Sequence, residues 1–90
     1  MRLFELARSL DITMTHLWVL VLLREHGRLA KHELAKGCKV STAAMTGALD
    51  VLATARLIDQ RVLPGNRRTH EVWLSDLGAM VMRTHNLAAA

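Results

Sequence analysis

The sequence predicts a mainly α-helical fold with one small β-hairpin, a winged helix-turn-helix whose elements follow the order α-α-β-α-α-β-β-α. A polar residue, Ser41, precedes a helix whose apolar residues recur at helical spacing, at Met45, Leu49 and Leu52. Two β-favouring runs, 58–63 and 69–74, then flank a turn with the sequence Pro-Gly-Asn-Arg-Arg. A helix with an apolar back, followed by a hairpin with a cationic tip, is the layout of a winged helix.

The N-terminal part of the chain predicts two helices. Residues 2–10 carry a single apolar stripe and are expected to form the first. Thr13 or Thr15 is suited to cap the second, at about 14–26, which is apolar on most sides. A helix of that kind lies in the centre of a fold, and Gly27 is expected to end it.

A helix-turn-helix unit is predicted next. After a short strand at 28–29, residues 31–36 are expected to form a helix that Gly37 stops. Ser41 then caps the following helix, which is predicted to continue to about Ala55. A short helix, a turn containing glycine and a second helix are the parts of this unit.

The hairpin is predicted from residues 57–63 and 69–74. Alternation along its second strand places Val72 and Leu74 on one face and Glu71 and Trp73 on the other. Ser75 is expected to cap a last helix, whose apolar stripe is Leu77, Met80, Val81, Thr84 and Leu87. Trp18 and Trp73 are expected to pack in the core and against the hairpin.

Length and composition predict one small domain over residues 1–90. The longest apolar run has seven residues, 17–23, far short of the roughly 20 that span a bilayer, so no membrane association is expected. The N-terminus carries acidic residues and does not resemble a secretory signal. A single cysteine excludes an intrachain disulfide and fits the reducing cytoplasm, where we expect the protein.

The distribution of charge indicates an anionic partner. The formal net charge is +4, and residues 28–68 contain eight Lys or Arg and only three acidic residues. The basic excess therefore lies within the predicted binding segment, which favours nucleic acid. The alternative is an ordinary solvated surface.

The ordered set of residues resembles the MarR family of bacterial transcription regulators over roughly residues 12–78. The matching residues, in chain order, are Ile12, Thr13, Val19, Leu20, Leu23, Glu33, Leu34, Ala35, Val40, Ser41, Met45, Thr46, Leu49, Asp50, Leu52, Leu57, Ile58, Arg61, Asn66, Arg67, Arg68, Leu74, Ser75 and Gly78. The sequence departs from the family where Asn66 replaces the usual aspartate and Arg56 replaces the usual glycine. It also resembles a short form, because family members usually continue through long C-terminal helices that build the dimer.

The resemblance implies a regulator that binds double-stranded DNA, with the helix from Ser41 in the major groove and the hairpin in the minor groove. The expected major-groove residues are Ser41, Thr42, Ala43, Ala44, Thr46 and Gly47, which include no Arg, Lys, Asn or Gln. Ser and Thr bond phosphates or base edges, and alanine touches a thymine methyl. The expected residues at the tip of the hairpin are Asn66, Arg67 and Arg68. The expected phosphate contacts are Lys31, His32, Lys36, Lys39 and Arg61.

Dimerisation is expected to help a single module bind DNA, and a possible homodimer seam pairs the apolar faces of residues 2–10 and 77–87. An alternative function is a winged-helix module that binds another protein and no DNA. The uncharged face of the helix from Ser41 favours that alternative, and the cationic hairpin favours DNA.

Other chemistry finds little support in the sequence. The five histidines and Cys38 are scattered without the short spacing of metal ligands, so neither a metal nor another cofactor is expected. No Gly-rich phosphate loop or catalytic constellation is present, so the chain is not expected to be an enzyme. Lys39 beside Cys38 is a possible cause of a lowered thiol pKa, and the role of Cys38 stays open between redox sensing and packing.

Overall fold

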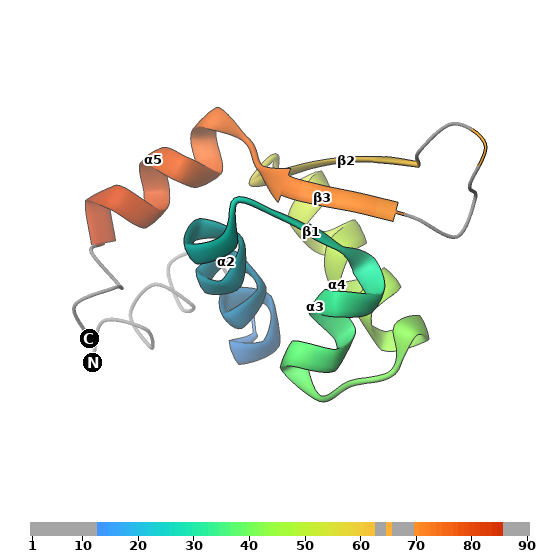
Figure 1. The fold of residues 1–90 in the computed structure, drawn as a ribbon. Coiled ribbons are helices and arrows are strands. Elements are labelled where there is room, and N and C mark those ends of the chain that lie inside the picture. The colour runs from blue at the N-terminus through green and yellow to red at the C-terminus, as the bar shows by residue number, and fades with distance from the viewer. Residues whose placement is uncertain (1–12, 63–64, 66–69, 86–90) are drawn as a thin grey trace.

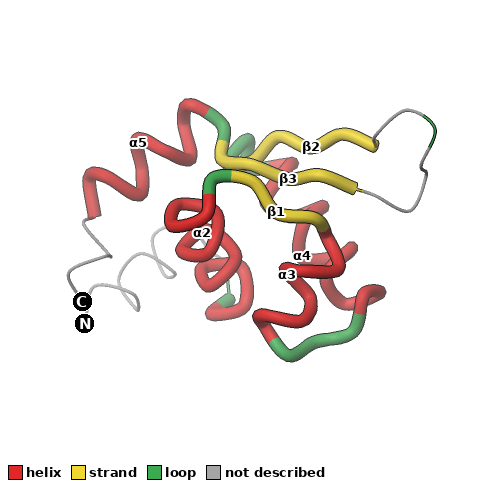
Figure 2. Tube along the Cα trace, viewed as in Figure 1, coloured by secondary structure: helices red, strands yellow, loops and turns green. Residues whose placement is uncertain are grey.

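The computed structural model describes residues 13–62, 65 and 70–85. The helices in this part of the chain are α2 (Met14–His26), α3 (Lys31–Cys38), α4 (Thr42–Thr54) and α5 (Asp76–His85). The strands are β1 (Arg28–Ala30), β2 (Ile58–Val62) and β3 (His70–Leu74). The predicted order of elements is thus confirmed from the second helix onward, and the helix predicted over residues 2–10 lies outside the described residues (Figures 1 and 2).

The three strands form one antiparallel sheet in the order β1-β3-β2. The hairpin pairs Ile58 with Leu74 and Val62 with His70, and β1 pairs Arg28 with Trp73. In Figure 1, α2, α3 and α4 lie below the sheet, the hairpin extends to one side and α5 leads away on the other. Val72 is fully buried, whereas the side chains of Glu71 and Trp73 contact Arg28. The predicted division of β3 into two faces is confirmed.

The core lies between the sheet and the three helices below it. Its buried apolar side chains come from α2, α3, α4, β2, β3 and α5 and from the residue before β2: Leu17, Val19, Leu20, Leu23, Leu34, Ala35, Met45, Ala48, Leu49, Leu52, Leu57, Ile58, Val72 and Met82. The helical spacing of Met45, Leu49 and Leu52 therefore predicted the buried face of α4 correctly. Trp18, expected in the core, is instead 45% exposed, because its neighbours Leu17 and Val19 occupy the inward face of α2.

The prediction that Gly37 stops the third helix is wrong. The helix α3 continues to Cys38, and Lys39 adopts the left-handed conformation at its C-cap, with φ of 58°. A Cβ at Gly37 would lie 3.1 Å from Cδ1 of Leu22. Glycine at this position therefore permits the close approach of α3 to α2 and does not end the helix.

The helix caps follow the sequence more closely. Thr13 accepts a hydrogen bond from the backbone N–H of His16 and forms a capping box with that residue. Ser41 Oγ accepts from the Ala44 N–H at 3.0 Å, so α4 begins where predicted. Ser75 Oγ accepts from the Gly78 N–H at 3.0 Å and donates to the Arg56 carbonyl at 2.6 Å, which fixes the start of α5.

The predicted apolar stripe of α5 is partly wrong. Leu77 and Met80 are 40% and 51% exposed, while the fully buried side chain of the helix is Met82. Gly78 is buried against the Leu57 carbonyl, and this close contact turns the helix so that Gly78 and Met82 face inward. Leu77 and Met80 are therefore left on its outer side.

Candidate nucleic-acid interface

The first two turns of α4 present a continuous exposed surface. All six residues predicted to enter the major groove are exposed, namely Ser41, Thr42, Ala43, Ala44, Thr46 and Gly47. The opposite face of the helix is buried through Met45, Ala48, Leu49 and Leu52. The apolar side of α4 thus anchors the helix, and its small-residue side remains free for contact with a partner.

Hydroxyl groups on this surface already take part in local hydrogen bonds. Ser41 Oγ caps α4, as described above, and Thr46 Oγ1 donates to the Thr42 carbonyl at 3.1 Å. Each hydroxyl oxygen keeps further capacity, because it has two lone pairs and one proton. These bonds fix the side-chain rotamers on the exposed surface before any partner binds.

A cation reaches this surface from the neighbouring helix. The Lys31 Nζ donates to Thr46 Oγ1 at 3.2 Å, so an ammonium group from the first residue of α3 lies over α4. The sequence of α4 itself contains no cation, and the surface was therefore predicted to be uncharged. The contact spans 15 positions in the chain, and only the packing of α3 on α4 reveals it.

The remaining cations of the helix-turn-helix surround the same region. His32 and Lys36 on α3 and Lys39 at its C-cap are exposed. In the part of the chain that the structure describes, none of the three forms an ion pair. Their side chains are thus exposed and without an ion pair in this part of the chain, and their contacts with phosphate stay a prediction.

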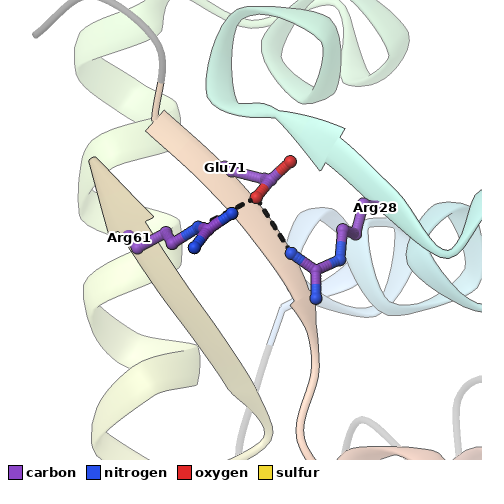
Figure 3. A network of polar contacts seen from close by, with 3 residues as sticks. All are labelled: Arg28, Arg61 and Glu71. Atoms are coloured by element: carbon purple, nitrogen blue, oxygen red, sulfur yellow. Dashed lines mark hydrogen bonds and ion pairs between the residues drawn. The ribbon is translucent and has the colours of Figure 1, made fainter. Parts of the chain in front are cut away.

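The outer face of the sheet carries a network of three charged residues (Figure 3). Glu71 on β3 accepts from Arg28 on β1 at 2.9 Å and from Arg61 on β2 at 3.2 Å, both through Oε1. Desolvation opposes ionisation of Glu71, but the hydrogen bonds and charges of the two arginines outweigh it and hold its pKa below the ordinary value. The Arg28 guanidinium also stacks 4.3 Å from the centre of the Trp73 ring. Arg61, expected to contact phosphate, is therefore ion-paired here.

A second polar group lies at the base of the hairpin. His70 Nε2 is 2.6 Å from Gln60 Oε1, which joins β3 to β2 by their side chains. Burial lowers the pKa of His70, the nearby charge of Lys31 lowers it further, and Asp50 on α4 opposes the change. His70 is the first residue of β3, and its pKa responds to charges on both α3 and α4. The contact between Gln60 and His70 depends on the pairing of β2 with β3, which no local sequence pattern shows.

The predicted hairpin-tip residues Asn66, Arg67 and Arg68 lie outside the described residues. The strands that lead to them are described, and Figure 1 shows β2 and β3 running away from α5 toward the opposite side of the sheet.

Cys38 and the histidines form no chemical centre in this region. Burial raises the pKa of the Cys38 thiol, so the expectation that Lys39 lowers it is wrong. Among the described residues, no group of three or more His, Cys, Asp or Glu side chains is arranged to hold a metal ion. Within the same ranges, no helix has both the length and the apolar character needed to cross a membrane.

A three-stranded sheet with a projecting hairpin, placed over a helix-turn-helix with an exposed second helix, defines a winged helix-turn-helix protein. The sequence profile of the MarR family matches residues 12–70, and the chain belongs to this family. Members of the MarR family are transcriptional regulators and not enzymes.

Solved structures of MarR-type proteins share the fold. YusO from Bacillus subtilis superposes with a TM-score of 0.82 at 27% identity, covering 94% of this chain and 60% of that one. A cysteine-to-serine variant of MarR from E. coli, complexed with operator DNA, superposes with a TM-score of 0.80 at 28% identity. The match covers 94% of this chain and 61% of that one. The MepR–DNA complex from S. aureus gives 0.84 at 20% identity, covering 94% and 70%, and shows the likeness of fold alone.

The chain spans about 60% of the length of YusO and of the E. coli MarR variant. A search of curated proteins finds no match to this sequence. The family and the fold thus rest on the profile match and on the solved structures.

Proposed function

We propose that residues 1–90 form a single DNA-binding domain that regulates transcription by binding specific double-stranded sequences. The helix α4 enters the major groove, and the hairpin tip with Asn66, Arg67 and Arg68 enters the adjacent minor groove. Membership of the MarR family and the likeness to a MarR structure complexed with operator DNA support this proposal.

The single observation that carries the proposal is the exposed surface of α4 with Lys31 held over it. Its side chains are small, so the helix backbone can approach the floor of a major groove closely. The free capacity of the Ser and Thr hydroxyls suits base edges or phosphates, and Ala43 and Ala44 suit thymine methyl groups. Lys31, hydrogen-bonded to Thr46, supplies the positive charge that this surface otherwise lacks.

Sequence-independent affinity comes from cations around α4. We assign phosphate contacts to Lys31, His32, Lys36, Lys39 and Arg61. Arg61 reaches a phosphate by giving up part of its pairing with Glu71, which keeps Arg28 as a partner. Each neutralised phosphate releases condensed counterions, so binding weakens as salt rises.

A homodimer through residues 2–10 and 77–87 is the second part of the proposal. Leu77 and Met80 are exposed on the outer side of α5, where they are available to a second copy. A dimer places two α4 helices on successive turns of DNA, and the operator is then a palindrome. Met80→Glu puts a charge into this seam, and light scattering should show a dimer for the wild type and a monomer for the variant.

The proposal is tested by replacing the two arginines of the hairpin tip. Arg67→Ala/Arg68→Ala should weaken binding to all duplex sequences by a similar factor, measured by fluorescence anisotropy. Arg56→Gly is the matched control, since it removes an exposed cation at the far end of α4, and its φ of 64° suits glycine. The control should bind as the wild type does.

A folded wild-type protein that binds no duplex at low salt would contradict DNA binding, and that result favours a module for protein interaction. An equal loss of affinity in the control and in the double variant would contradict the assignment of the hairpin tip to the minor groove.

A further inference from the structure

An open pocket of about 650 Å³ lies between the C-terminal end of α2, the strands β1 and β3, and α5. It is at the end of the sheet from which α5 leads away, opposite the turn between β2 and β3 (Figure 1). The proposed DNA contacts use none of the residues that line it. Its lining combines apolar and basic side chains: Leu23, Leu74, Ala79, Arg24, Arg28 and Arg83.

Arg24 is the most unusual of these residues. Its Nη1 and Nη2 atoms are buried, and neither has a hydrogen-bond partner in the described part of the chain. Among the described residues, the carboxylate paired with it is that of Glu25, whose Oε1 is 3.9 Å from Nη2 and whose side chain is 57% exposed. A buried guanidinium without a hydrogen-bonded anion is unfavourable, so Arg24 is the group that a bound anion would satisfy.

The charge around the pocket points to the same class of ligand. Three arginine residues line it, and Arg83 forms no ion pair among the described residues. Arg28 is paired with Glu71, but the same carboxylate oxygen also accepts from Arg61. Glu71 therefore keeps one arginine when Arg28 turns toward the pocket.

The geometry of arginine favours phosphate over a single negative charge. A guanidinium presents its donors as a planar fork that matches phosphate oxygens, and a dianion can satisfy more than one such fork. We propose that this pocket binds a small phosphate monoester, with its phosphate held by Arg24, Arg28 and Arg83 and its organic part against Leu23, Leu74 and Ala79. The site shares no lining residue with the proposed DNA contacts, and in the described part of the chain the two are linked only through Glu71, which pairs with both Arg28 and Arg61.

The test uses phenyl phosphate and the intact chain in a calorimetric titration, with sodium chloride keeping the ionic strength constant. The wild type should bind, and Arg24→Met should bind about tenfold or more weakly, because a charge-assisted hydrogen bond is lost. Arg56→Gly is the matched control, since it removes an exposed cation that lies outside the pocket and outside the proposed DNA contacts, and it should leave the affinity unchanged. Arg24→Met without ligand should unfold at the same temperature as the wild type or higher, because an apolar side chain replaces an unpartnered charge.

Three outcomes would overturn the proposal. They are no binding by the wild type, equal affinities of the wild type and Arg24→Met, and equal losses in Arg24→Met and the Arg56 control. Benzoate carries the same ring with one negative charge, and if it binds as tightly as phenyl phosphate the assignment to phosphate is wrong. Should Arg24→Met fail to fold, the exposed Arg83→Gln provides the same comparison.

Discussion

Replacing Gly78 by alanine should destabilise the fold strongly, because the first turn of α5 lies against the backbone that leads into β2. A Cβ at Gly78 would lie 2.0 Å from the Leu57 carbonyl oxygen, 3.0 Å from its carbon and 3.3 Å from Cδ2 of Leu74. Ordinary carbon–oxygen contacts begin at roughly 3.3 Å, so the helix or the Leu57 peptide must move by about 1 Å. Backbone cannot rotate out of the way as the end of a side chain can.

The cost of that movement has two parts. Overpacking of a filled interior costs typically about 1–3 kcal/mol. The same carbonyl accepts the Ser75 N–H at 3.1 Å, and weakening this hydrogen bond adds about 1 kcal/mol. We expect a total near 3 kcal/mol. In a domain of this size each kcal/mol lowers the melting temperature by roughly 4–8 °C.

Thermal unfolding followed by circular dichroism measures the effect, with urea unfolding as a second measurement. The control is Gly47→Ala on α4, where an added Cβ meets no atom within 4 Å. Alanine in a helix interior is favoured over glycine by roughly 0.5–1 kcal/mol, so this control should be slightly more stable than the wild type. If Gly78→Ala unfolds within 2 °C of the wild type, roughly the precision of such a melt, the account of α5 docking is wrong.

Two further predictions concern charge. Burial lowers the pKa values of His70 and His16 below the ordinary 6.5, so below about pH 6.5 the unfolded chain binds protons that the folded chain does not. The free energy of unfolding should therefore reach its full value above that pH and fall as the pH drops toward the pKa values of the folded state. Urea unfolding at several pH values measures this change. In His70→Gln the free energy of unfolding should depend less on pH. Arg61→Gln should remove one phosphate contact and make the log–log slope of DNA binding against salt shallower by about 0.9, measured by anisotropy. An unchanged slope would show that Arg61 makes no phosphate contact.

The parts of the fold that local chemistry determines could be predicted from the sequence. Ser41 is a good N-cap, and the spacing of Met45, Leu49 and Leu52 gives the buried face of α4 without knowledge of its neighbours. In the same way, the alternation of side chains along β3 predicted which residues lie on each of its two faces. The exposure of all six residues on the outer face of α4 followed directly from these predictions.

The errors and omissions arise where distant segments meet. Gly37 was read as a helix stop, but its role is to leave room for Leu22 of α2, and no local pattern encodes that contact. The α5 stripe was misplaced because the approach of Gly78 to Leu57 decides which side of the helix faces inward. The hydrogen bond from Lys31 to Thr46 likewise joins positions 15 residues apart. The ion pair of Arg28 with Glu71 joins positions 43 residues apart.

The most direct test of the central claim is the salt dependence of duplex binding by the wild-type protein. Fluorescence anisotropy gives the affinity for a mixed-sequence duplex at several salt concentrations, and light scattering gives the mass of the protein in the same buffers. Contacts from five cations to phosphates predict a slope of log K against log salt of about −4 to −5. A folded protein whose slope is near zero, or that does not bind at low salt, would contradict the assignment of α4 and the hairpin to DNA.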